Sequence, residues 1–189
     1  MSKVNYGIQD VYIAKITENN GEITYGTPFP IKGAKSLSVD PEGGDATPFY
    51  ADNIVYFMAP AVNNGYSGDL VLAITPDSFL TQILGQEKDS DGVVYETADD
   101  KNARFALLFQ AQGDSNNRRF CFYDCTASRP SRDNETKEDT IEPGTDTLAI
   151  TMNPRSTDRM VKCYIDETTE NKSIYDAWFD AVHEKSSSI

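Results

Sequence analysis

The sequence predicts a mainly β protein: a two-sheet β-sandwich or barrel-like fold with one or two short α-helices beside it. Three observations indicate this class. Apolar and polar residues alternate along several short segments, and clusters of glycine, asparagine and aspartate separate those segments. Two segments, residues 71–74 and 106–109, are apolar on both sides, which predicts strands that are covered on both faces.

The individual strands follow from the alternation. Residues 66–75 alternate between two sides and follow a predicted Asn-Gly turn at residues 64–65. Residues 105–111 repeat the pattern, and a turn at residues 113–117 leads into a return strand. That strand carries Phe120 and Phe122 on one side and Cys121, Tyr123 and Cys125 on the other. Further strands are expected at residues 11–17, 23–31, 34–39, 53–58, 148–153 and 160–165.

Two helices are expected between the strands. The first starts at Thr75-Pro76-Asp77, where threonine would be the cap and proline the first helical residue, and it ends before Gly85. The second covers about residues 172–184, where an apolar stripe predicts packing against the sheet. The stripe consists of Ile174, Ala177, Trp178, Ala181 and Val182.

A chain of 189 residues is expected to form a single domain, residues 1–189, and is long enough to bury a core. Residues 40–47 and 127–147 fit neither strand nor helix and are expected to be long loops or arms, the second strongly charged. They are either solvated insertions or segments that become ordered against a neighbouring subunit. Residues 186–189 are expected to form a flexible C-terminal tail.

The charge of the chain excludes one class of partner. Acidic side chains number 30 and basic ones 17, so the formal net charge is −13. Binding to nucleic acid or to anionic lipid needs clusters of lysine and arginine that neutralise phosphates. We therefore expect neither adhesion to DNA nor association with a membrane.

The N-terminus lacks the apolar segment of a secretory signal, and no segment has the roughly 20 apolar residues that span a bilayer. The protein is therefore expected to fold in a cytosol, where thiols stay reduced. Cys121 and Cys125 lie too far apart along one strand for a disulfide, so free buried thiols are expected. Zinc is less favoured because only His183 could join the three cysteines, and no cofactor is expected.

No set of residues predicts catalysis. The chain has one histidine and no nucleophile beside a base. Residues 89–92, Asp-Ser-Asp-Gly, resemble the start of a calcium loop but lack its later ligands, so a hairpin turn is favoured. Acidic pairs such as Asp99-Asp100, or Asp139 with Glu142, occur in any acidic β protein. The sequence therefore predicts a protein that is not an enzyme.

Several segments together resemble a known family. The run PFYADNIVY, followed by NNGYSGDLVLAITPDSFLTQILG, is similar to the major tail proteins (tail tube proteins) of bacteriophages with long, non-contractile tails. The similarity continues in FALLFQAQGD, RFCFYDCTASRPS, TKEDTIEPGTDTLAITMNPR and YDAWFDAV. The similar segments occur in the same order and cover nearly the whole chain. None of them is a catalytic signature, so the resemblance is specific only because all of them occur together and in order.

The resemblance implies a structural virion protein that assembles with itself into stacked rings, hexameric in the family, around a channel for the genome. The partners it implies are further copies of the chain and the tape measure, tail tip and tail terminator proteins. DNA would pass through the lumen without specific binding, since an acidic channel repels phosphates. The implied location is the virion tail, after assembly in the cytoplasm of the bacterial host.

Contacts between subunits and between rings are expected where strands meet loops. The candidates are Asp40, Glu42, Asp45, Phe49, Tyr50, Asp52, Tyr56, Asn64, Tyr66, Arg129, Arg132, Lys137 and Glu138. Arg118, Arg119, Arg129 and Arg132 are expected away from the lumen, as partners of neighbouring subunits. The alternative function is a carbohydrate-binding β-sandwich of the adhesin type, in which the ten tyrosines would stack on sugars.

Overall fold

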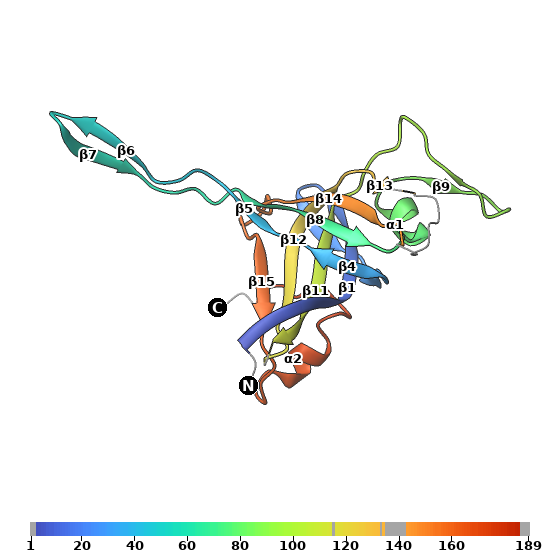
Figure 1. Cartoon of the computed structure of the whole chain (residues 1–189). Coiled ribbons are helices and arrows are strands. Elements are labelled where there is room, and N and C mark those ends of the chain that lie inside the picture. Colours follow the sequence, from blue (N-terminus) through green and yellow to red (C-terminus); the bar gives the residue numbers. More distant parts are fainter. Residues whose placement is uncertain (1–2, 115, 133, 135–142, 186–189) are drawn as a thin grey trace, which may run out of the picture.

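The mainly β prediction is confirmed by a computed structural model, which describes residues 3–114, 116–132, 134 and 143–185 (Figure 1). Its strands are β1 (Lys3–Asn19), β2 (Glu22–Tyr25), β3 (Phe29–Pro30), β4 (Ala34–Leu37), β5 (Asp40–Glu42), β6 (Thr47–Ala51), β7 (Ile54–Ala59), β8 (Gly65–Leu72), β9 (Glu87–Lys88), β10 (Val94–Tyr95), β11 (Phe105–Asp114), β12 (Arg119–Ala127), β13 (Ser131–Arg132), β14 (Asp146–Met152) and β15 (Lys162–Ile165). The helices are α1 (Asp77–Gln82) and α2 (Lys172–Asp176), and neither described helix has the length and apolarity to cross a membrane.

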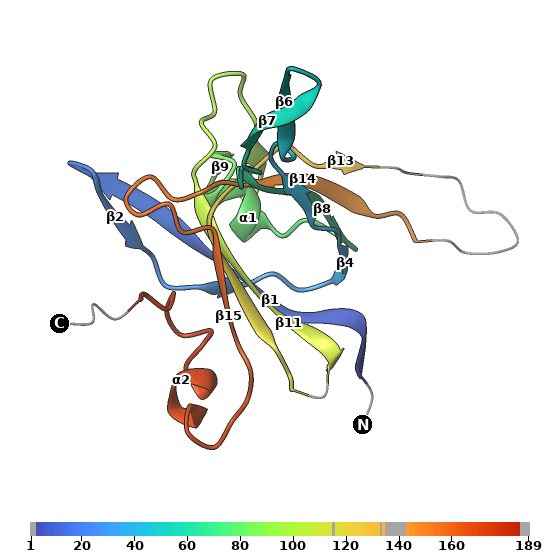
Figure 2. The same ribbon diagram turned by 90° about the vertical axis from the view of Figure 1, so that its left-hand side faces the viewer.

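Eleven of the strands in the described residues form one antiparallel sheet, whose path is β2-β1-β11-β12-β14-β8-β4. Strands β3, β5, β13 and β15 pair along its sides. The sheet curls on itself, so that β4 returns beside β1, and β8 and β14 run across the direction of β11 and β12 (Figures 1 and 2). This is the barrel-like form of the predicted fold, built from one continuous sheet.

The curl encloses the main core. Inward-facing residues of β1, β8, β11, β12 and β14 meet the apolar side of α1, where Phe79 packs edge-on against Phe105. Burial of such side chains is the dominant stabilising contribution to a fold of this kind. The core consists of Val11, Ile13, Ile31, Leu70, Leu72, Phe79, Ile83, Leu84, Phe105, Leu107, Phe122, Cys125, Ala127, Leu148, Ile150 and Met152.

A second apolar cluster covers the outer face of β11 and β12. Ala106 and Leu108 alternate with the core residues of β11, and Trp178, only 2% exposed, packs over them from the C-terminal segment. The prediction that residues 106–109 are covered on both faces is therefore confirmed. The same prediction is wrong for residues 71–74, because β8 ends at Leu72 and Ile74 lies exposed in the following bend.

The predicted second helix is shorter than expected. Helix α2 ends at Asp176, and turns carry the chain onward. Trp178 and Val182 are buried, whereas Ile174, Ala177 and Ala181 are exposed. Only two of the five residues of the expected apolar stripe therefore pack against the sheet.

The first helix also starts differently from the prediction. Pro76 is the N-terminal cap, and no side chain of the described residues completes the cap. The backbone N–H of Thr75 instead donates to Asp146 Oδ2 at 2.7 Å. Gly85 follows the helix at φ +78°, a conformation that glycine adopts without strain, so the predicted end is correct.

The cysteines are free, but Cys121 and Cys125 do not share a face. Cys121 belongs to the outer cluster and Cys125 to the main core. The register with β11 shifts between Phe122 and Cys125, and such a bulge turns the next side chain to the opposite face.

Candidate interaction surface

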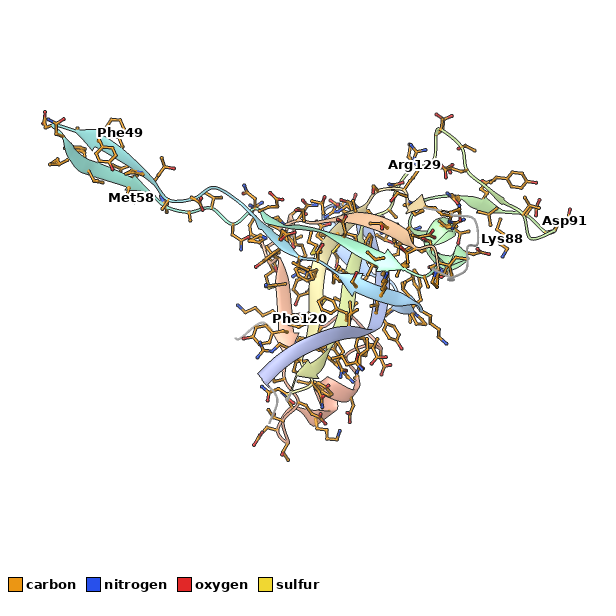
Figure 3. The ribbon with its side chains drawn as sticks, viewed as in Figure 1. Phe49, Met58, Lys88, Asp91, Phe120 and Arg129 are labelled. Carbon is orange, nitrogen blue, oxygen red and sulfur yellow. The ribbon has the colours of Figure 1, made fainter. Side chains whose placement is uncertain are left out.

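The most exposed apolar element is the β6–β7 hairpin, which extends away from the body (Figures 1 and 3). Its tip is Asp52-Asn53, with φ of 51° and 61°. Aspartate and asparagine tolerate this left-handed region, and two such residues match the strand twist of a tight hairpin. We call residues 43–64 the arm.

The arm exposes apolar side chains on both faces. Phe49 is paired with Phe57 and Pro48 with Met58, so consecutive pairs point to opposite sides. Tyr56 is 73% exposed and Phe49 61%. The exposed apolar residues of the arm are Phe49, Tyr50, Ile54, Val55, Tyr56, Phe57, Met58 and Val62. A two-stranded hairpin alone is marginally stable, and such a patch marks an interaction site.

The root of the arm is held by backbone hydrogen bonds. The N–H of Asn64 donates to the Glu42 carbonyl and the N–H of Val62 to the Gly44 carbonyl, both at 2.9 Å. A side chain at Gly43, φ +154°, would place its Cβ 1.8 Å from the Val62 carbonyl oxygen. Only glycine allows this close approach, so the two strands leave the body together.

Strand β5 anchors the root to the sheet. Asp40, Pro41 and Glu42 pair with Ser67, Tyr66 and Gly65 of β8. The Ser67 hydroxyl lies 2.5 Å from Glu42 Oε1. The expectation of a loop over residues 40–47 is therefore wrong for its first half. Strand β5 forms there because it pairs with the part of the β8 edge that β4 leaves unpaired. The Asn-Gly turn expected at residues 64–65 is wrong too: Gly65 starts β8, and the turn lies at the arm tip.

An apolar groove opens beside this root. Its volume is about 540 Å³, and its floor is formed by Tyr66, Phe109, Phe120 and Phe122. Phe109 stacks on Phe120, with ring centroids 5.1 Å apart, and Tyr66 meets Phe122 edge-on at 5.6 Å. The ladder of rings reaches the surface at Tyr164, whose ring centroid lies 6.1 Å from that of Phe120. Figure 3 places Phe120 in the body, away from the arm tip.

Two lysines border the groove. Lys35 and Lys162 line it, and the Lys162 ammonium lies 4.3 Å from the centroid of the Tyr66 ring. Within residues 3–114, 116–132, 134 and 143–185, neither lysine forms an ion pair with a carboxylate. The groove therefore combines an aromatic floor with positive charge at its rim.

The arginines expected to face neighbours have partners within the chain. Arg118 pairs with Asp166 at 2.6 Å, and Arg119 lies over the rings of Tyr175 and Phe179. These contacts fasten α2 and its flanking turns to the main sheet. Hydrogen bonds from Arg118 lower the pKa of the Asp166 carboxyl, and Asp166 thus favours its charged form.

Two of the expected contact residues, Arg129 and Arg132, also make ion pairs within the subunit. Arg129 pairs with Glu96 at 2.8 Å and Arg132 with Asp146 at 2.7 Å. Strand β13 therefore replaces part of the loop expected over residues 127–147. Lys137 and Glu138, together with residues 133, 135–136 and 139–142 of that loop and the tail at residues 186–189, lie outside the described residues.

The other expected contact residues gather on one side of the fold. They lie on the arm, at its root or on the neighbouring end of β8, and all but half-buried Tyr66 are exposed: Asp40, Glu42, Asp45, Phe49, Tyr50, Asp52, Tyr56, Asn64 and Tyr66. Sequence reasoning missed the rest of the arm and the groove. A sharper signal was present in Asp52-Asn53 between two apolar runs, since such a pair favours a tight hairpin.

The acidic motif at residues 89–92 forms the predicted hairpin turn between β9 and β10. The Asp89 carboxylate accepts the N–H groups of Val93, at 2.8 Å, and Asp91, at 3.0 Å. The hydrogen bond from Val93 is the largest cause of the lowered pKa of the Asp89 carboxyl.

Among the described residues no group of three or more His, Cys, Asp or Glu side chains could hold a metal ion. His183 stacks on Trp178, with ring centroids 5.8 Å apart.

Comparisons with known proteins identify one family. A protein-family model described as "Phage tail tube protein" matches residues 1–178. No curated protein matches the chain. One similar solved chain comes from the "Cryo-EM structure of the anti-feeding prophage (AFP) baseplate, 6-fold symmetrised"; it has 10% sequence identity and a TM-score of 0.43, and the match covers 88% of this chain and 98% of that chain.

Proposed function

The chain belongs to the phage tail tube protein family, and from this premise we propose that it assembles into stacked rings that form the tube. The rings are hexameric and surround a channel through which DNA passes during ejection. The phage has a long, non-contractile tail. The family match favours this function over the carbohydrate-binding alternative.

The observation that carries the proposal is the arm with exposed apolar residues on both faces. A hairpin of this kind gains stability when neighbouring copies cover it. Its contact is heterologous, because the arm of one copy meets a different surface of the next. Heterologous contacts produce rings when the rotation closes.

The acidic balance suits a channel for DNA. At −13 for each subunit, a ring of six would carry six times that charge, or −78. Even a fraction of this charge at the lumen repels phosphates, and DNA slides through without adhering. The subunit holds no catalytic role in this account.

The partners are those of a tail. Copies of the chain form the rings, and the tape measure, tail tip and tail terminator proteins contact the tube along its lumen and at its ends. Assembly takes place in the cytoplasm of the bacterial host, and the finished protein is part of the virion. The chain forms one tube domain over residues 1–189.

A concentration series tests self-association. Size-exclusion chromatography with light scattering is expected to show growing assemblies for the wild type, and a monomer for Phe49→Ser/Tyr56→Ser. Tyr95→Ser is a matched control, because Tyr95 is an exposed tyrosine of the β9–β10 hairpin. A wild type that stays monomeric at high concentration, and with tail-tip proteins added, contradicts the proposal.

A further inference from the structure

We propose that the arm tip of one copy docks in the aromatic groove of a neighbouring copy, with Asp52 against the lysines of the rim. This inference rests on the proposed self-assembly and names the surface that receives the arm. The occupant is a second copy of this chain.

The arm has the composition that the groove requires. Between residues 46 and 63, Asp52 is the only charged residue, and it lies at the tip. Apart from Thr47 the two strands carry only apolar or aromatic residues, and their large side chains are exposed. A ligand of this kind inserts rings into an apolar site and brings one negative charge with it.

The groove has the aromatic surface and the positive charge that match the arm tip. Its floor of stacked rings is open to solvent, and half-buried Phe109 and Phe120 present unused aromatic surface. Aromatic pairs in offset or edge-on arrangement contribute about 0.5–1.5 kcal/mol beyond the area they bury. Lys35 and Lys162 at the rim lack carboxylate partners within the described part of the chain, so they are available to Asp52.

Because of where the root and the groove lie, the arm of one copy meets the groove of another copy and not its own. Tyr66 lines the groove and is also the residue paired with Pro41 at the root of the arm. The arm leaves this region and points away from the body, so its tip lies far from its own groove (Figure 3). Each copy therefore gives its tip to one neighbour and receives a tip beside its own root from another, as a closed ring requires.

Charge reversal tests the pairing. Asp52→Lys alone, and Lys35→Glu/Lys162→Glu alone, are each expected to lower the assembled fraction at least tenfold at a fixed concentration. The triple variant, with the charges exchanged, is expected to regain most of it. Lys101→Glu, an exposed lysine in the loop before β11, is the control and is expected to assemble normally.

Carbodiimide cross-linking shows which copies meet. Wild-type assemblies made from an equal mixture of isotopically light and heavy protein are expected to give Asp52 linked to Lys35 or Lys162. Mixed light–heavy pairs should make up about half of these peptides, as random mixing requires. Assemblies that form without this link, with a triple variant no better than its parents, overturn the docking but leave the proposed function intact. A wild type that forms no assembly under any condition overturns both.

Discussion

The guanidinium of Arg132 donates two hydrogen bonds to the carboxylate of Asp146, at 2.7 and 2.9 Å, although the Asp146 residue is only 2% exposed. The same carboxylate accepts the N–H of Thr75 at the entrance to α1. One buried acid thus joins β13, β14 and the start of α1. It fixes the base of the charged segment at residues 127–147 to the sheet.

Removing this acid is expected to destabilise the subunit. In Asp146→Ala the buried N–H of Thr75 loses its acceptor, which costs roughly 1–3 kcal/mol of unfolding free energy. Urea unfolding followed by circular dichroism measures the change. Asp99→Ala, in an exposed turn, is the control, and equal stability for both variants would mean that the network contributes nothing.

The stability of the fold is expected to fall in acid through the same residue. Hydrogen bonds from Arg132 are the largest cause of the lowered pKa of Asp146 in the folded protein. An aspartate in the unfolded chain has a pKa of about 3.9, which is higher than the pKa of Asp146 in the folded protein. The unfolded chain therefore takes up the proton first, and protonation favours unfolding. The contribution is complete above about pH 4 and is lost as the pH falls through the folded pKa. Urea titrations at several pH values should show a steeper loss for wild type than for Asp146→Asn; parallel curves would contradict the assignment.

Polar substitutions on the arm are expected to leave the monomer intact. Phe49 and Tyr56 lie outside both buried clusters, and surface substitutions of this type usually change the free energy of unfolding by less than about 0.5 kcal/mol. Phe49→Ser/Tyr56→Ser should therefore unfold like the wild-type monomer while failing to assemble. A large loss of monomer stability would show that the arm belongs to the folded core.

Cys163 is expected to be the most reactive thiol. It is half-buried, and hydrogen bonds from Cys121 and Tyr123 lower its pKa, whereas burial raises the pKa of Cys125. A thiolate is the species that reacts. Mass spectrometry after brief treatment of the native protein with iodoacetamide should find label on Cys163 first, and more slowly in Tyr123→Phe. Preferential labelling of Cys125 would contradict the assignment.

DNA is expected to bind neither the subunit nor the assembly, because the chain carries a net charge of −13. Fluorescence anisotropy with duplex DNA at low salt measures this. Binding in the micromolar range that weakens with salt would mean that basic residues face the channel.

The sequence predicts the central strands well because their patterns are local. Large apolar side chains recur at every second position in residues 105–111 and 148–153, and both segments form strands near the expected bounds. The return strand is found, but its bulge before Cys125 depends on the register with β11, which no local pattern encodes. The second helix is too long in the prediction because turns after Asp176 bury Trp178 and Val182 equally well.

The candidate site is only partly visible in the sequence. Phe49, Tyr50 and Tyr56 lie on an exposed element, and their contact with other subunits stays a prediction. In the sequence Phe57 and Met58 look like core residues, since alternation alone does not reveal that both faces of the hairpin are uncovered. The groove joins residues of β1, β4, β8, β11, β12 and β15, and only the curl of the sheet brings all of these strands together.

Negative-stain electron microscopy of the concentrated protein tests the central claim most directly. The wild type is expected to form rings or tubes with a central hole, and Phe49→Ser/Tyr56→Ser is expected to form none, while Tyr95→Ser behaves as wild type. Assemblies without a central hole, or tubes that form equally well when the arm is substituted, would contradict the account.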